Sequence, residues 1–423
     1  MPAIRALEFF CGIGGLHYGL LLSQSSSNPE SNEPAVARED ACTVVEAYDI
    51  NHVTNAIYTH NFGVRPEQKA IEKLTVKELD AFKANLWLLS PPCQPFTRGG
   101  KRLDDQDPRS KGLLHLISLI PKLSHPPTHL LLENVVNFET SQSRNKLVSM
   151  LTRENYEFEE WILSPLQFGI PNDRKRYYLT ARKKVTDDES GDASVKLSDS
   201  APVDDKSVET ATDELITVPL NLKMEWPHPV KPLDVLSSYL DSHLNGQIGG
   251  STPHMPASTL IGSETTDSLN SNSKRKNEAT DVDALKIPEA FVKKRKFISD
   301  GYVVGPSDKK SACFTKAYGH HGIGAGSFLQ TKGFDVPKNL DDPSAAVETY
   351  GLRFFSPMEV ARLHGFPVKE SQAGSEPVGK KEKGKEFTFP AESTLIQRYR
   401  VLGNSLNVVV VAGLLKYAVF GGK

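Results

Sequence analysis

Short apolar runs alternate with stretches of helical spacing in the first part of the chain. The runs that begin at Ile4, Cys42, Leu86 and Thr128 have the length of buried strands, and residues 112–123 carry apolar side chains at helical spacing. Strands that alternate with helices are typical of a parallel sheet covered by helices. The pattern therefore predicts an α/β fold.

The run at residues 86–89 leads into Ser90-Pro91-Pro92-Cys93-Gln94. The prolines remove backbone donors and bias the residue before each of them away from helix, so they end the strand. Cys93 then lies just past the C-terminal end of the strand, at the edge where open parallel sheets bind ligands. A thiol fixed at this edge suits a nucleophile. A buried structural cysteine in a proline-rich turn explains the stretch equally well when it is taken alone.

A glycine-rich turn follows the first run, at residues 10–15, and leads into a helix. Its glycines allow a tight turn and the close approach of a nucleotide-like cofactor. His17 breaks the GxGxxG fingerprint, so this turn alone is a weak signal. The second run ends at Asp49, which is placed either to hold ribose hydroxyls or to cap the helix that begins near Asn51.

Three further charged residues are candidates for chemistry. Glu133 ends the run that begins at Thr128, where a poorly solvated carboxylate can donate or share a proton. Arg174 and Arg176 stand two positions apart in a strand-like stretch, so we expect them on one face of the strand. Their guanidinium groups suit a phosphate or a base carbonyl. Ordinary ion pairing at the strand end, or an exposed charged strand face, explains these residues as well.

Charge and cysteine content narrow the class of protein. The 423 residues carry a net charge of -2, which argues against a protein that coats nucleic acid and leaves room for a local basic site. The four cysteines are far apart, so neither a zinc site nor a disulfide framework is expected, and no metal is predicted. We see no signal peptide and no apolar stretch long enough to span a bilayer, and expect a soluble, monomeric, cytoplasmic protein.

The composition changes after residue 184. We expect a catalytic domain over residues 1–184, a smaller inserted domain over 185–344, and a return segment over 345–423 that completes the catalytic domain. Polar insertions at about 185–214 and 262–283 have too few apolar residues to fold, and a mobile loop is expected at about 369–386. A chain that leaves its sheet and then returns would close a cleft between the two domains.

Two basic runs lie within the predicted inserted domain, at residues 274–276 and 293–296. They are consistent with a nuclear signal, with phosphate contacts, or with an ordinary solvated face, and they leave open whether the protein also enters the nucleus.

Five motifs in order complete the picture: FxGxGG at residues 10–15, PPCQ at 91–94, ENV at 133–135, RxR at 174–176 and GNS at 403–405. With them the chain resembles the cytosine-5 methyltransferases over about two thirds of its length. Cys313-Phe314-Thr315, followed by Lys316, and Asn172 where DNA enzymes usually have Gln, resemble the DNA-methyltransferase-like tRNA-aspartate methyltransferases.

This resemblance implies a Rossmann-like sheet domain, which uses S-adenosylmethionine, with an inserted target-recognition domain. It also implies methylation of cytosine 38 in the anticodon loop of tRNA-Asp. Cys93 would add to C6 of the cytosine, and Glu133 would bind or protonate N3 and the exocyclic amine. Arg174 and Arg176 would hold the base carbonyl, the catalytic loop or a phosphate. A positive neighbour should help Cys93 to ionise.

The remaining site residues are carried over from the same resemblance. The expected cofactor residues are Phe10, Gly12, Ile13, Gly14, Gly15, Asp49, Ile50, Ile71, Glu72, Pro92, Asn404 and Ser405. The expected substrate residues are Gln94, Lys293, Lys294, Arg295, Lys296, Cys313, Thr315 and Lys316.

Three functions stay open at this point: a tRNA methyltransferase, a DNA cytosine methyltransferase, and a nucleic-acid-binding protein that keeps the fold without turnover. The sequence supports DNA as the substrate less strongly than tRNA. The intact PPCQ, ENV and RxR motifs weaken the third, and Cys313-Phe314-Thr315 weakens the second.

Overall fold

The computed structural model describes residues 3–24, 42–94, 96, 104–184, 219, 221–242, 282–288, 302–321, 324–369 and 384–421. Its main sheet has six strands in the order β2-β1-β3-β4-β6-β5. The strands are β1 (Ile4–Phe9), β2 (Cys42–Tyr48), β3 (Leu86–Leu89), β4 (His129–Val135), β5 (Tyr156–Leu163) and β6 (Arg176–Lys183). The first four are parallel, and β6 is antiparallel to both β4 and β5. The predicted α/β class is confirmed.

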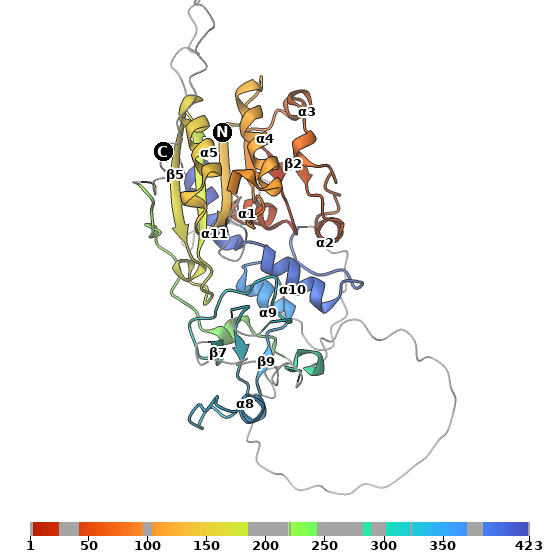
Figure 1. The fold of residues 1–423 in the computed structure, drawn as a ribbon, viewed down its shortest axis with the longest axis vertical. Helices are drawn as coiled ribbons and strands as arrows, with labels where there is room; N and C mark the ends of the chain where they lie inside the picture. The colour runs from red at the N-terminus through yellow and green to blue at the C-terminus, as the bar shows by residue number, and fades with distance from the viewer. Residues whose placement is uncertain are drawn as a thin grey trace, which may run out of the picture.

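Helices cover both faces of this sheet (Figure 1). On one face, α3 (Val76–Ala81), α4 (Lys111–Leu119) and α5 (Gln142–Arg153) pack against Trp87, Leu89 and their neighbours. On the other face, α1 (Gly15–Gln24) and α11 (Val408–Leu415) pack against Leu86 and Leu88. Successive side chains of a strand point to opposite faces, and both faces are covered, which is why these strands read as unbroken apolar runs.

A second sheet has three short strands, β7 (Val303–Val304), β8 (Phe328–Leu329) and β9 (Arg353–Phe354). The helices around it are α8 (Pro343–Thr349), α9 (Pro357–Leu363) and α10 (Leu395–Asn404), and α9 and α10 lie between the small sheet and the main sheet (Figure 1). The small sheet draws strands from both sides of residue 344, where the sequence predicts a domain boundary. α2 (His52–Phe62) flanks the main sheet near β2.

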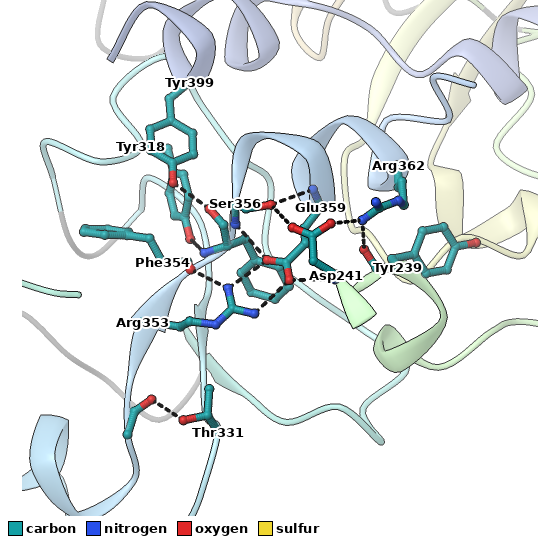
Figure 2. Close-up of polar contacts among 12 residues, drawn as sticks. Tyr239, Asp241, Tyr318, Thr331, Arg353, Phe354, Ser356, Glu359, Arg362 and Tyr399 are labelled. Atoms are coloured by element: carbon teal, nitrogen blue, oxygen red, sulfur yellow. Dashed lines mark hydrogen bonds and ion pairs between the residues drawn. The ribbon is translucent and has the colours of Figure 1, made fainter. Parts of the chain in front are cut away.

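A buried polar network fixes α9 to the small sheet (Figure 2). Arg353 forms a two-pronged ion pair with Glu359, with distances of 2.8 and 2.7 Å. Ser356 caps α9 by accepting from the backbone N–H of Glu359, and its hydroxyl also donates to Asp241. Arg362 pairs with the other oxygen of Asp241 at 2.7 Å. Each buried charge in this network is thus paired with an opposite charge, because an unpaired charge in the interior is strongly destabilising.

The sequence-based expectation about apolar stretches needs one correction. By length and composition alone, Leu395–Phe420 is apolar enough to cross a membrane, although 61% of its most apolar window is buried. The run is not one continuous helix, since α10 ends at Asn404 and α11 begins at Val408. Because Val410, Val411 and Leu414 are part of the core under the main sheet, we assign the run to that core.

Several predicted features lie outside the described residues. They are the basic runs at 274–276 and 293–296, the insertion at 185–214, almost all of the insertion at 262–283, and most of the loop at 369–386.

Candidate active site

Cys93 lies in a turn at the C-terminal edge of the main sheet, as the sequence predicts. The backbone N–H of Ser90 still donates to the carbonyl of Phe9 on the neighbouring strand, at 3.3 Å. The carbonyl of Cys93 then accepts from Phe96, at 3.0 Å, which closes the turn. Asn134 holds the turn from the next strand by donating to the carbonyl of Pro91 at 3.3 Å. The thiol is therefore presented from a fixed, half-buried position.

Glu133 stands on the adjacent strand and is 7% exposed. Its Oε2 accepts a hydrogen bond from the hydroxyl of Ser90 at 2.9 Å, and its Oε1 lies 3.6 Å from Nε of Arg176. The antiparallel register between β4 and β6, in which Arg176 is opposite Val135, brings the arginine to this edge. Ser90 is a site residue that the sequence reading missed, although it stands next to the PPCQ motif.

Arg174 is placed differently from its expected position. β6 begins only at Arg176, so the two arginines do not share a strand face. Arg174 is 2% exposed, and its guanidinium donates to the thiol of Cys313 at 3.2 Å and to the carbonyl of Phe314 at 2.8 Å. The same fork donates to the carbonyls of Gly403 and Ser405. Its contacts therefore tie the second half of the chain to the sheet.

Three segments meet at this point. Nη2 of Arg176 lies 3.7 Å from the thiol of Cys313. Gly403 packs so closely on the backbone of Thr315 and Lys316 that a Cβ there would lie 2.1 Å from the nearest atom. Asn172 donates to the carbonyl of Ala312 at 3.0 Å. The structure thus brings together the RxR, GNS and Cys313-Phe314-Thr315 segments, although they are far apart in sequence. Lys316 is exposed beside them, and Gln94 is half-buried next to Cys93.

The two thiols of the site have opposite electrostatic environments. Burial raises the pKa of Cys93, and the charge of Glu133 adds to this rise, while Arg176, Arg174 and Lys316 lower it by less. Burial also acts to raise the pKa of Cys313, but Arg174 and Arg176 outweigh it and the pKa falls below its usual value. The expected positive neighbours of Cys93 are therefore present, but they do not by themselves make it a thiolate.

The other predicted group of residues lies around the glycine turn. Asp49 accepts hydrogen bonds from the backbone N–H of Gly12 at 2.9 Å and of Asn51 at 2.8 Å, so it ties the turn to the start of α2. Asn51 itself caps α2 by accepting from Val53. Burial raises the pKa of Asp49, and these backbone bonds oppose the rise. Asp49 serves the backbone in this way whether or not it also meets a ribose.

The space beside this turn fits a ligand. Gly12 has a φ of +54°, and a Cβ built on it would meet nothing within 4 Å. Ile50 exposes 67% of its surface, which is a large exposure for an apolar side chain. Gly14 is different, because a Cβ there would lie 2.3 Å from the ring of Phe62. Gly12 therefore leaves room for a ligand, whereas Gly14 is required by packing.

The remaining predicted cofactor residues have varied surroundings. Phe10 and Ile71 both lie against Gly112 of α4, and Ile13 is buried in the core. Glu72 and Asn404 are exposed, Pro92 is half-buried next to Cys93, and Ser405 lies against Gly15. Among the residues that the structure describes, no group of three or more His, Cys, Asp or Glu side chains is placed to hold a metal ion.

Comparison with known proteins identifies the family of the chain. The family model of the C-5 cytosine-specific DNA methylases matches residues 4–418. The chain belongs to this family. It is therefore an S-adenosylmethionine-dependent cytosine-5 methyltransferase, and its sheet is the methyltransferase sheet of the family.

Relatives of the chain match it along almost its whole length. It is 33% identical to a "DNA (cytosine-5)-methyltransferase" of Dictyostelium discoideum, which covers 99% of this chain and 95% of that protein. It is 32% identical to the human "tRNA (cytosine(38)-C(5))-methyltransferase", over 98% of this chain and 99% of that protein. The crystal structure of the Schizosaccharomyces pombe Dnmt2 methyltransferase superimposes with a TM-score of 0.64, at 28% identity and 99% coverage of both chains.

Proposed function

We propose that this protein methylates C5 of cytosine 38 in the anticodon loop of tRNA-Asp, using S-adenosylmethionine and a covalent bond from Cys93 to C6 of the base. The observation that carries the proposal is the placement of Cys93, Glu133 and Arg176 at one sheet edge, against the Cys313-Phe314-Thr315 segment. Relatives from human, cattle and S. pombe named as tRNA (cytosine(38)-C(5))-methyltransferases support the choice of substrate.

The residues at the edge can divide the chemistry as follows. The Cys93 thiolate attacks C6, which makes C5 nucleophilic enough to take a methyl group. Glu133 lies where it can bind the exocyclic amine and a protonated N3, and Ser90 and Arg176 hold its carboxylate in place. S-adenosylmethionine supplies the electrophilic methyl group. After transfer, C5 loses its proton and the bond between Cys93 and C6 breaks.

The electrostatics of the site couple base binding to activation of the thiol. The negative charge of Glu133 raises the pKa of Cys93 in the free protein. When a protonated N3 lies on Glu133, that charge is balanced, and Arg176, Arg174 and Lys316 then act on the thiol with less opposition. The nucleophile is therefore activated when the correct base is bound, and it is protected from side reactions otherwise.

For the cofactor we propose the turn at residues 10–15 and the start of α2. Open space at Gly12 and the exposed side chain of Ile50 fit the adenosine part of S-adenosylmethionine. The Oδ atoms of Asp49 already accept from Gly12 and Asn51, and a carboxylate has lone pairs left for ribose hydroxyls. Phe10 and Ile71 would line the adenine, and Ser405 would lie towards the methionine end.

RNA is favoured over duplex DNA for an energetic reason. Extrusion of a base from a duplex costs a few kcal/mol, whereas a base in an anticodon loop is already partly unstacked. With a net charge of -2, the protein has little non-specific attraction to phosphates to help open a duplex. Recognition should then depend on the shape of the loop and on local lysines such as Lys316.

The test is a comparison of purified protein on a tRNA-Asp transcript and on duplex DNA at matched salt, with labelled S-adenosylmethionine. A tRNA-Asp in which cytosine 38 is replaced by uracil is the matched control. Methylation of the normal transcript alone is expected. Equal or faster turnover on duplex DNA would refute the tRNA assignment and favour the DNA activity that the Dictyostelium relative is named for.

A further inference from the structure

A buried carboxyl group lies directly beneath the glycine turn and has no part in the mechanism above. Glu8 is 0% exposed and stands near the end of β1. Its Oε1 accepts from the backbone N–H of His17, in the first turn of α1, at 3.2 Å. Its Oε2 lies 2.9 Å from the hydroxyl of Tyr58 on α2. One side chain thus joins the strand before the turn, the helix after it, and a third element, α2, beside it.

His17 closes this group of three side chains. Its Nδ1 lies 2.7 Å from the hydroxyl of Tyr58, and its ring stacks on Phe62 with centroids 4.0 Å apart and planes 6° from parallel. Gly14, in the middle of the turn, packs directly on Phe62 and Tyr58. The position of the turn is therefore set by these rings and by the hydrogen bonds that hold them.

The group is built to be uncharged near neutral pH. Burial raises the pKa of Glu8 to about 8; Asp49 adds to this rise, and the hydrogen bonds from Tyr58 and His17 oppose it. Burial lowers the pKa of His17 to about 3, so its ring stays neutral. Burial raises the pKa of Cys11 well above the usual value, and the charge of Glu8 adds to this rise. In the described part of the chain, no lysine or arginine forms an ion pair with Glu8.

We propose that Glu8, Tyr58 and His17 form a network that holds one proton and positions the glycine turn, so that binding of the cofactor depends on whether Glu8 is protonated. The inference rests on the proposal that this turn binds S-adenosylmethionine. With the proton on Glu8, the carboxyl donates to the hydroxyl of Tyr58, which donates to Nδ1 of His17. Without it, Tyr58 must turn its hydroxyl to the carboxylate, and a negative charge without a counterion lies under the turn.

Two matched variants separate this role from ordinary packing. Glu8→Gln keeps the size and the hydrogen-bonding capacity of the side chain but cannot ionise. Tyr58→Phe keeps the ring under Gly14 but removes a hydrogen bond that lowers the pKa of Glu8, so its ionisation should move to higher pH. Glu8 and Tyr58 are positioning residues here, so the diagnostic measurement is a pH profile and not a loss of activity alone.

The experiment is calorimetric titration of the full-length protein with S-adenosylmethionine and with S-adenosylhomocysteine between pH 6.5 and 9.5. For the unaltered protein we expect both affinities to fall by about tenfold above pH 8. A tenfold fall corresponds to a difference of about one unit between the pKa of Glu8 in the free and in the ligand-bound protein. Glu8→Gln should change by less than about twofold over the same range, and Tyr58→Phe should show the fall at higher pH. Identical profiles for the unaltered protein and Glu8→Gln would overturn the proposal. An affinity that rises above pH 8 for the cationic S-adenosylmethionine but not for S-adenosylhomocysteine would also overturn it, because that result indicates direct charge attraction.

Thermal unfolding without cofactor gives an independent measurement. The folded-state pKa of Glu8, about 8, lies above its ordinary value of 4.5, so the unfolded chain loses this proton first as the pH rises. The unfolding temperature of Glu8→Gln minus that of the unaltered protein should therefore grow between about pH 4.5 and pH 8 and stay level above pH 8. We call this difference the advantage of Glu8→Gln. No change in this advantage would contradict the buried proton. If neither ligand binds at any pH while the advantage still grows, the cofactor assignment fails and the proton-holding network stands.

Discussion

Nη2 of Arg174 donates to the backbone carbonyl of Gly403 at 3.1 Å, across a separation of 229 residues in the sequence. The other guanidinium nitrogen donates to the carbonyl of Phe314. One buried side chain therefore connects the main sheet, the segment after the small sheet's first strand, and the turn between α10 and α11. The segments around Cys93 are therefore held together by contacts of this kind and not by a continuous stretch of chain.

The first prediction concerns this connection. Replacing Arg174 with Met should lower the free energy of unfolding by about 3 kcal/mol, because several buried carbonyls lose their donors. Chemical denaturation is the measurement. Arg153→Met is the matched control, since that side chain is 68% exposed and its loss should change stability by less than about 0.5 kcal/mol. Equal effects of the two variants would show that Arg174 does not join the segments.

The second prediction concerns the nucleophile. Cys93→Ala should abolish methyl transfer and leave the affinity for S-adenosylmethionine within about twofold, because the proposed cofactor residues are mainly on other elements. Product formation and calorimetric titration measure the two effects. Activity within a few fold of the unaltered protein would exclude Cys93 as the nucleophile.

The third prediction distinguishes the two thiols of the site. A tRNA with 5-fluorocytosine at position 38 should form a stable covalent complex, because fluorine cannot leave C5 as a proton does. Peptide mass spectrometry should find the nucleotide on Cys93. An adduct on Cys313, whose thiol has the lower pKa, would transfer the catalytic role to that residue.

The fourth prediction is a pH dependence. Burial raises the pKa of Cys93, so only a small fraction is thiolate at pH 7, and that fraction grows as the pH rises. The kcat/KM for tRNA, which reports the free protein, should therefore increase by up to about tenfold per pH unit above pH 7. A kcat/KM that is flat from pH 7 to pH 9 would contradict the raised pKa of Cys93 in the free protein.

The fifth prediction concerns substrate binding. Lys316→Glu should raise the KM for tRNA by several fold at low salt. It should also reduce the slope of log KM against log salt concentration by the equivalent of about one phosphate contact. The affinity for S-adenosylmethionine should not change. Lys77→Glu is the control, because Lys77 is an exposed lysine on α3, which lies at the opposite end of the sheet domain from α10 (Figure 1). A similar loss in both variants would indicate a general charge effect.

Four of the six strands and the edge residues beside them could be predicted from the sequence. Each of the four apolar runs is long enough for one strand and closes on, or is followed by, a proline, glycine or acidic residue, so the pattern locates both the strand and the end at which side chains gather. Cys93, Asp49 and Glu133 follow from this reasoning because their positions depend on the residues next to them.

The partners of these residues were decided by the tertiary structure alone. Periodicity places Arg174 beside Arg176 on a strand, but the strand begins at Arg176 and the guanidinium of Arg174 points to residues more than 130 positions away. The order of the two thiol pKa values depends on burial and on charges brought in by distant segments. The network of Glu8 likewise needs three elements in contact. A local pattern reports which face of an element is buried, and it carries no information on which distant side chain fills the space opposite.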